Sequence, residues 1–212
     1  AHSRLMRECR PGMAEYQLAS LFRHHCQMNG ADQLAYQSIV GGGNNACVLH
    51  YVENSEALQD GDLVLIDAGC ELGFYASDIT RTFPVNGRFS PPQRELYELV
   101  LAAQEAAIRK VKPGNHWNDP HQAAVRTLTK GLVGLGILKG QVTRLVRQEA
   151  YRGFYMHRTG HWLGMDVHDV GDYKVGEEWR VLEPGMVLTV EPGLYMAAGS
   201  KGVGRKWWNI GV

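Results

Sequence analysis

Acidic residues interrupt three apolar segments that are expected to be strands. Asp67 lies in the apolar run that begins at Leu63, Asp78 follows eleven residues after Asp67 beyond a predicted turn, and Glu191 ends the apolar run 186–190. A carboxylate buried alone among apolar side chains is strongly destabilising unless a cation or strong donors accompany it. Three such interruptions favour a bound metal ion over three unrelated salt bridges.

His161 adds a nitrogen donor to this acidic set. It lies between Gly160 and the apolar segment Trp162-Leu163-Gly164. A histidine in such a place is more often simply packed or hydrogen-bonded, so the acidic residues carry the argument. Three carboxylates and one imidazole form an oxygen-rich donor set, which suits Mn, Mg or Co-like ions better than a cysteine-ligated zinc. Two adjacent ions would hold a bridging hydroxide, the nucleophile for amide hydrolysis, because coordination lowers the pKa of water to about 7.

Three further histidines accompany these segments. His50 follows a glycine-rich stretch, His157 lies four residues before His161, and His168 lies seven residues after it. Histidine can polarise a scissile carbonyl, move a proton or hold a substrate. Each of the three, taken alone, is better explained as a surface or core residue.

The composition excludes several broad classes of function. The chain has 212 residues, 44% of them hydrophobic, and a formal net charge of zero. A chain of this kind buries a sizeable core and has no general attraction for nucleic acid or an anionic membrane. It has no apolar run long enough for a transmembrane helix and no signal-peptide pattern. Its four cysteines form no Cys-x-x-Cys pair, which favours reduced thiols in the cytoplasm.

Apolar periodicity and turn residues predict an α+β fold, because antiparallel hairpins are separated by helices. The glycine-rich stretch 39–45 is expected to be a turn. The predicted helices span residues 13–29, 91–107, 119–136 and 141–151. The predicted strands span residues 63–69, 75–83, 186–191 and 206–212.

Several of these segments together resemble one family, the pita-bread metallopeptidases. The resemblance is carried by Leu65-Ile66-Asp67-Ala68-Gly69, Ser77-Asp78-Ile79-Thr80-Arg81-Thr82-Phe83, Gly160-His161-Trp162-Leu163-Gly164, Asp166-Val167-His168-Asp169-Val170-Gly171 and Thr189-Val190-Glu191-Pro192-Gly193. The family includes aminopeptidase P, prolidase, methionine aminopeptidase and the metal-free creatinase, and the aminopeptidase P members are the most similar. The resemblance implies a curved antiparallel sheet with helices on its outer face and two halves related by a pseudo-twofold axis.

The resemblance also implies a set of metal ligands. Asp67 would chelate one ion, Asp78 would bridge two ions, and His161 and Glu191 would ligate the second ion. The implied cofactor is a pair of Mn²⁺ ions, with Co or Zn as alternatives.

Further site residues are implied in the same way. His50, His157 and His168 match the family's substrate-contacting and proton-handling histidines. Tyr36 and Tyr195 match tyrosines near the metal centre and are candidates for substrate contact.

The implied activity is metal-dependent hydrolysis of the bond between an N-terminal residue and a following proline. The alternatives are an Xaa-Pro dipeptidase and a catalytically impaired fragment or pseudo-enzyme of the same fold. A metal-free hydrolase of the creatinase type is disfavoured, because the acidic ligands are present. The expected partner is a peptide with proline at its second position, without nucleic acid or membrane, and the family suggests a homo-oligomer.

Residues 1–212 are expected to be one metallopeptidase catalytic domain that is incomplete at both ends. The family has an N-terminal domain and a fifth, bridging glutamate in a late strand, and neither is in this sequence. The chain by itself is therefore expected to bind metal weakly or to bind a single ion.

Overall fold

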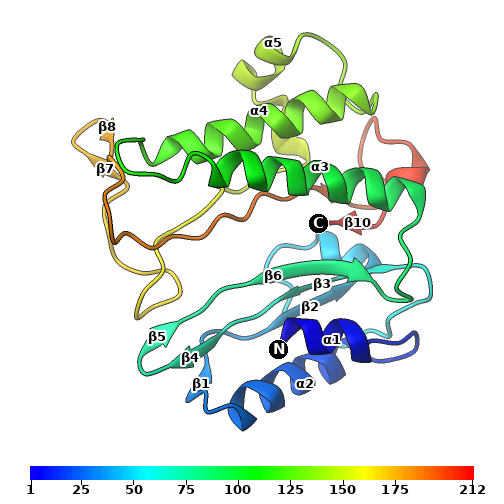
Figure 1. Cartoon of the computed structure of the whole chain (residues 1–212). Helices are drawn as coiled ribbons and strands as arrows, with labels where there is room; N and C mark the ends of the chain where they lie inside the picture. The colour runs from blue at the N-terminus through cyan, green and yellow to red at the C-terminus, as the bar shows by residue number, and fades with distance from the viewer. The chain divides into compact units, whose positions relative to one another are not determined.

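The chain folds into two units, and both combine helices with short antiparallel strands (Figure 1). Unit 1 comprises Ala1–Leu96, Gly164–Val167 and Tyr195–Val212, and unit 2 comprises Tyr97–Leu163 and His168–Leu194. The computed structural model describes all of residues 1–212. Helices and antiparallel strands are mixed along the chain, which confirms the predicted α+β class.

The main sheet of unit 1 has three antiparallel strands in the order β2 (Ile39–Gly42), β3 (Leu63–Asp67) and β6 (Thr80–Pro84). Successive side chains of a strand point to opposite faces. Val64 and Ile66 of β3 accordingly pack into one apolar cluster, and Leu65 packs into another. Both faces of β3 are therefore buried, which explains its nearly continuous apolar sequence.

Two helices of unit 1 contribute to the first of these clusters. They are α1 (His2–Glu8) and α2 (Glu15–Met28), and both lie beside the main sheet in Figure 1. Their buried side chains in the cluster are Leu5, Leu18, Phe22 and Cys26. The helix predicted at residues 13–29 is thus confirmed as α2 with ends shifted by one or two residues.

The remaining strands of unit 1 are short. A second sheet has the order β1-β4-β5, and β9 pairs with β10. A Cβ atom at Gly211 of β10 would lie 2.0 Å from the carbonyl oxygen of Ala46, so this close approach requires glycine. These elements are β1 (Gln33–Leu34), β4 (Cys70–Leu72), β5 (Tyr75–Ala76), β9 (Tyr195–Met196), β10 (Ile210–Gly211) and the short 3₁₀ helices η1 (Gly43–Cys47) and η3 (Arg205–Trp207).

Unit 2 is built on two helices that pack closely. A Cβ atom at Gly131 of α4 would lie 2.1 Å from a methyl carbon of Leu99 in α3, so the glycine permits close packing of the pair. A separate apolar cluster contains Trp117, Trp162 and Leu182. The elements are α3 (Pro91–Ile108), which begins within unit 1, α4 (Asn118–Gly134), α5 (Val142–Arg147), η2 (Ala150–Gly153), β7 (Lys174–Val175) and β8 (Glu178–Trp179).

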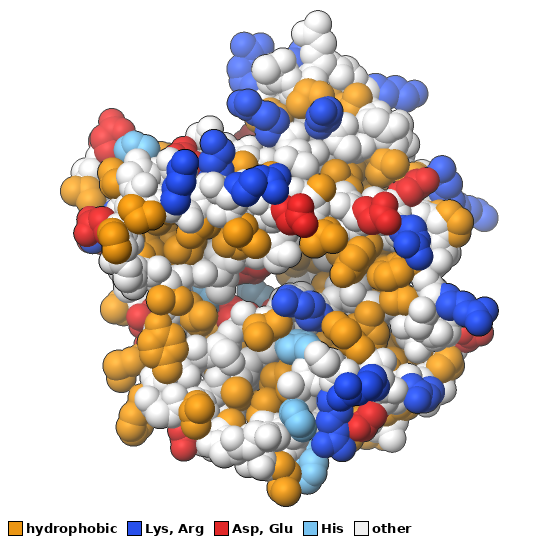
Figure 2. Space-filling view, viewed as in Figure 1, with side chains coloured by type: hydrophobic (Ala, Val, Ile, Leu, Met, Phe, Trp, Pro, Cys, Tyr) orange, Lys and Arg blue, Asp and Glu red, His pale blue; other side chains and the backbone are white.

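The surface carries charges of both signs. Figure 2 shows Lys and Arg side chains interspersed with Asp and Glu side chains among apolar ones on the face in view. The sequence has 22 basic and 22 acidic residues, so neither sign predominates. None of the helices combines the length and the apolar character needed to span a membrane.

The prediction of a strand at residues 186–191 is wrong, because these residues do not form a regular strand. Residue 188 forms only an isolated antiparallel bridge, to Trp162. The backbone N–H of His161 donates to the hydroxyl of Thr189, 3.0 Å away, whereas the N–H of Thr189 donates to the carbonyl of His161. A side-chain hydroxyl therefore takes the place of one carbonyl acceptor, and the ladder is interrupted.

The predicted strand at residues 75–83 is also interrupted, and Asp78 lies between β5 and β6. The N–H of Cys70 donates to the hydroxyl of Ser77, while the N–H of Ser77 donates to the carbonyl of Cys70. A hydroxyl again interrupts the backbone hydrogen bonds between the two segments, and Asp78 lies in the irregular stretch that results.

Two smaller predictions were wrong in part. The stretch 39–45, expected to be a turn, is β2 followed by η1, because Ile39 to Gly42 pair with β3. The strand expected at residues 206–212 contains the end of η3 and is extended only at β10.

Candidate metal centre

In unit 1, two of the predicted ligands converge on one tyrosine. The hydroxyl of Tyr36 hydrogen-bonds to Oδ1 of Asp67 and, at 2.9 Å, to Oδ1 of Asp78. Asp67 is the last residue of β3, and both carboxylates are half-buried. Two carboxylates that share one phenol repel each other, and a divalent cation would relieve this repulsion. The carboxylate oxygens of Asp67 and Asp78 therefore suit a bound metal ion.

Burial raises the pKa of the Tyr36 hydroxyl well above its ordinary value, and the charges of Asp67 and Asp78 raise it further. The phenol consequently keeps its proton at neutral pH, and its single O–H is shared between the two carboxylates. A tyrosine in this state orients the acidic groups without itself becoming a charged ligand.

A glycine makes the approach of these groups feasible. A Cβ atom at Gly69 would lie 1.7 Å from the carbonyl oxygen of Ser77 and 3.0 Å from the ring of Tyr36. Gly69 directly follows Ala68, which is buried. Only a residue without a side chain allows β3, the Ser77 backbone and the tyrosine to meet here.

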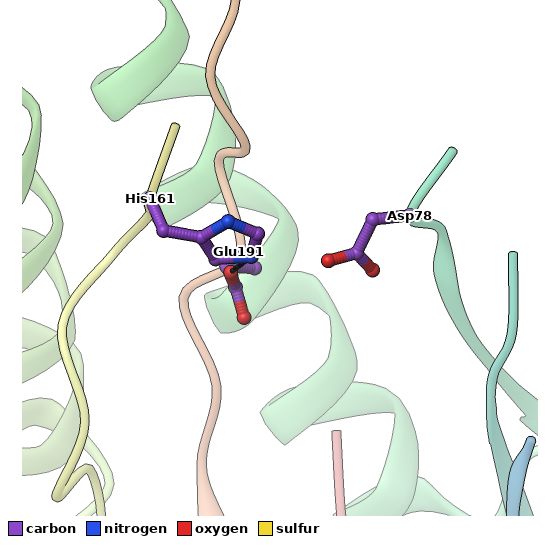
Figure 3. A group of neighbouring side chains, drawn as sticks. All are labelled: Asp78, His161 and Glu191. Atoms are coloured by element: carbon purple, nitrogen blue, oxygen red, sulfur yellow. Dashed lines mark ion pairs between the residues drawn. The ribbon is translucent and has the colours of Figure 1, made fainter. Parts of the chain in front are cut away.

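In unit 2, His161 and Glu191 form a second group. A dashed line in Figure 3 marks the close approach of these two side chains, and Asp78 is drawn on a separate segment. Nε2 of His161 lies 3.2 Å from Oε1 of Glu191. Nδ1 of His161 lies 2.8 Å from the carbonyl oxygen of Trp162. A carbonyl only accepts, so Nδ1 carries the proton and Nε2 faces the carboxylate, an arrangement typical of metal-binding histidines.

Thr189 connects the two residues of this group. Its hydroxyl donates to Oε1 of Glu191 at 2.8 Å and accepts the backbone N–H of His161 at 3.0 Å. The hydroxyl thus fixes the carboxylate of one residue relative to the backbone of the other. Sequence reasoning missed Thr189, although its position two residues before Glu191 on an extended segment places both on the same face.

Glu191 has further support from its backbone. Its N–H donates to the carbonyl of Thr159 at 2.8 Å. The buried hydroxyl of Thr159 lies 2.6 Å from the hydroxyl of Tyr155 and 2.8 Å from Nδ1 of His121. Burial, followed by the charge of Arg158, lowers the pKa of His121 to about 4. This network was not found from the sequence, because its members are scattered among apolar and helical segments.

Two predicted histidines also lie in unit 2. The ring of His168 meets that of His161 edge to face, with centroids 4.3 Å apart, and His168 is exposed. The ring of His157 packs edge to face on Tyr155 at 4.9 Å. His168 thus lies beside a predicted ligand, and His157 lies beside the Tyr155 that supports the Glu191 backbone through Thr159.

The other two predicted site residues, His50 and Tyr195, lie in unit 1. His50 is exposed and has a φ angle of 55°. Tyr195 in β9 packs on the cluster that contains Leu65 and Tyr51. The assignment of all these residues to catalysis or metal binding stays a prediction at this point.

Comparison with known proteins shows the family. The model of metallopeptidase family M24 matches residues 1–206. An Xaa-Pro aminopeptidase of Haemophilus influenzae is 54% identical over 211 residues, which cover 100% of this chain and 49% of that protein. A human Xaa-Pro dipeptidase is 42% identical over 92% of this chain and 43% of that protein. The solved structure of Pseudomonas aeruginosa aminopeptidase PepP matches with a TM-score of 0.98 and 60% identity, covering 100% of this chain and 48% of that one.

These matches confirm the predicted pita-bread fold, because the TM-score of 0.98 applies to the whole of this chain. The chain spans about half the length of the relatives that it matches. The family model covers nearly every residue, including all the predicted ligands. The chain belongs to metallopeptidase family M24.

Proposed function

We propose that the full-length protein is an Xaa-Pro aminopeptidase, which hydrolyses the bond between an N-terminal residue and a following proline. The observation that carries this proposal is the convergence of Asp67 and Asp78 on the Tyr36 hydroxyl, which favours divalent ions at that place. The 54% identity to an Xaa-Pro aminopeptidase over the whole of this chain supports the choice of substrate. The chain itself is proposed to be one catalytic domain of that longer protein.

The proposed ligands of two divalent ions are Asp67, Asp78, His161 and Glu191. They offer carboxylate oxygens and an imidazole nitrogen, the donors that Mn²⁺ and similar ions prefer, and Mn²⁺ is the proposed metal. Bound ions of this kind lower the pKa of water and polarise an amide carbonyl. Co or Zn are the alternatives to be compared with Mn²⁺.

The protein's own residues orient this chemistry. Thr189 holds the Glu191 carboxylate through its hydroxyl, and the carbonyl of Trp162 holds the His161 ring through Nδ1. His168, next to His161, and His50 are proposed to bind the substrate and to transfer protons, together with His157. Histidine suits these roles because its pKa lies near neutrality.

A cytoplasmic location is proposed from the state of the cysteines. All four are free thiols, and Cys9 and Cys26 are buried. Burial raises the pKa of Cys9 to about 11 and that of Cys47 to about 12. Such thiols stay protonated and unreactive at neutral pH, which suits a reducing compartment. The proposed partners are the proline-containing peptide and, by family resemblance, further copies of the same protein.

The test measures release of the N-terminal residue from an Xaa-Pro-Yaa tripeptide by the full-length protein with added Mn²⁺. An Xaa-Ala-Yaa peptide is the control for proline specificity, and an Xaa-Pro dipeptide separates the two peptidase classes. An aminopeptidase is expected to cleave the Xaa-Pro-Yaa tripeptide and to leave the alanine peptide largely intact. Turnover of the dipeptide alone would show a dipeptidase, to which the human relative points, and no turnover would refute both.

A further inference from the structure

Glu15 is a completely buried acid that the metal centre does not use. It is the first residue of α2 and has 0% exposure. Oε1 accepts the N–H of Gly42 at 2.8 Å and the side-chain amide of Asn45 at 3.1 Å. Oε2 accepts the hydroxyl of Tyr51 at 2.8 Å and the N–H of Glu56 at 3.0 Å. Four neutral donors thus surround one buried carboxylate.

A carboxylate suits this place because it only accepts hydrogen bonds, at up to four positions. The N–H groups of Gly42 and Glu56 and the amide of Asn45 contribute only donors to it. Losing the acceptor would leave buried donors unsatisfied, which costs more than the hydrogen bonds themselves contribute. Glu15 is therefore the common acceptor for a set of groups that come from one segment of the chain.

That segment is residues 43–56. Gly42 immediately precedes it, Asn45 and Tyr51 lie within it and Glu56 is its last residue, so the four donors hold it at both ends and in the middle. A further anchor is the side chain of Asn54, which accepts the N–H of Val40 at 2.9 Å. After η1 the segment has no regular secondary structure. These side-chain hydrogen bonds therefore hold it in place of the backbone hydrogen bonds of a strand or helix.

His50 stands on this segment, directly before the buried Tyr51. Its φ angle of 55° lies in the left-handed region, which residues other than glycine adopt only when their surroundings hold them there. The next residue, Tyr51, is itself well held: it belongs to the buried cluster that contains Ile39 and Leu65, and its hydroxyl donates to Glu15. Glu15 is thus connected to the exposed His50 through the adjacent Tyr51.

We propose that Glu15 is a positioning residue, which acts through Tyr51 to hold His50 in the orientation needed to bind the peptide substrate. The inference rests on the proposed function, because it assigns a task to His50. Glu15 itself touches neither substrate nor metal in this scheme. A purely structural acid would stabilise unit 1 without any specific connection to His50, and the experiment separates the two.

The test variants are made in the full-length protein with Mn²⁺. Tyr51→Phe keeps the packing of the ring and removes the hydroxyl, which donates to Glu15 and accepts the side-chain amide of Asn45 at 3.0 Å. It is milder than Glu15→Gln, which places an amide N–H₂ against donors. Tyr16→Phe, at a side chain that is 57% exposed on the same helix, and Glu53→Gln, at an exposed residue of the same segment, are the matched controls.

Three quantities are measured for each variant. They are kcat/KM for an Xaa-Pro-Yaa peptide, the Mn²⁺ dissociation constant by calorimetry, and amide hydrogen exchange of the peptides covering residues 43–56. Tyr51→Phe is expected to lower kcat/KM about tenfold, comparable to losing one hydrogen bond to a charged group, and to accelerate exchange in this segment. The Mn²⁺ affinity is expected to stay within twofold, and both controls are expected to resemble the wild type.

The decisive comparison is a double variant. If Tyr51 acts through His50, His50→Ala with Tyr51→Phe is no slower than His50→Ala alone. The positioning role would be overturned if the losses of kcat/KM in the two single variants multiply in the double variant, or if His50→Ala is fully active. Absence of turnover in the wild type would refute the proposed function. Hydrogen exchange in residues 43–56 would then still decide whether Glu15 holds the segment. Unchanged exchange in both Tyr51→Phe and Glu15→Gln would show that it does not.

Discussion

The hydroxyl of Thr189 donates a hydrogen bond to Oε1 of Glu191, with 2.8 Å between the two oxygens. The same hydroxyl accepts the backbone N–H of His161. The side chain of Thr189, 28 positions after His161, thus connects two predicted ligands. The strength of metal binding is expected to depend on this hydroxyl, although it contacts no metal in the proposed site.

Thr189→Val is therefore expected to weaken Mn²⁺ binding by about 10- to 100-fold, the usual cost of losing a group that orients a metal ligand. Valine has the same shape and lacks the hydroxyl, so the carboxylate of Glu191 loses a donor. Thr189→Ser should restore most of the affinity. Calorimetric titration with Mn²⁺ measures the effect, and Thr127→Val, whose hydroxyl bonds to a helix carbonyl, is the control. Equal affinities for Thr189→Val and the wild type would contradict the prediction.

Asp78→Asn is expected to abolish most of the thermal stabilisation that Mn²⁺ gives. A ligand at 100 times its dissociation constant stabilises the folded protein by about 2.7 kcal/mol, and this gain disappears when the site is lost. The metal-free variant should be at least as stable as the metal-free wild type, because the repulsion between Asp67 and Asp78 is removed. Tm is measured with and without Mn²⁺, with Asp60→Asn at an exposed aspartate as the control. An unchanged Mn²⁺-induced shift would exclude Asp78 as a ligand.

Gly69→Ala is expected to destabilise the protein by about 3 kcal/mol, the upper range for overpacking a close contact. The added Cβ would lie 1.7 Å from the carbonyl oxygen of Ser77, the residue directly before Asp78. Gly134→Ala, where nothing lies within 4 Å of the added Cβ, is the matched control and should leave stability unchanged or raise it by about 0.5 kcal/mol. Denaturant unfolding compares the two, and equal effects would refute the argument.

Protein stability is expected to fall as the pH is lowered from about 6.5 to about 4, in part because of His121. Burial lowers its pKa from 6.5 in the unfolded chain to about 4 in the folded protein. The unfolded chain therefore binds more protons in this window, and the contribution of the neutral ring is complete above the window and lost below it.

For this one ring the loss is about 2 kcal/mol, with allowance for its partial exposure. Urea unfolding of the wild type and of His121→Gln at pH 7, 5.5 and 4 isolates the contribution. Parallel stability profiles for the two proteins would show that His121 is not responsible.

The sequence by itself determined the three long helices α2, α3 and α4 and the identity of the candidate ligands. Helical periodicity and a proline at the start placed α3 correctly, since local patterns fix the buried face of a helix. Carboxylates inside apolar segments identified Asp67 and Glu191, because such residues are costly unless something binds them. These signals depend on residues close together in the chain, and they were sufficient to predict the α+β class and the family.

Only the tertiary structure decided how those ligands are held. The hydroxyls of Ser77 and Thr189 accept backbone N–H groups in place of carbonyls, and this interrupts two strands that the sequence predicted to be regular. The sequence gives no sign that Glu15 and Glu56, separated by 41 positions, are bonded. Whether a backbone N–H meets a carbonyl or a side chain depends on which distant segment folds against it, and local patterns contain no information about that partner.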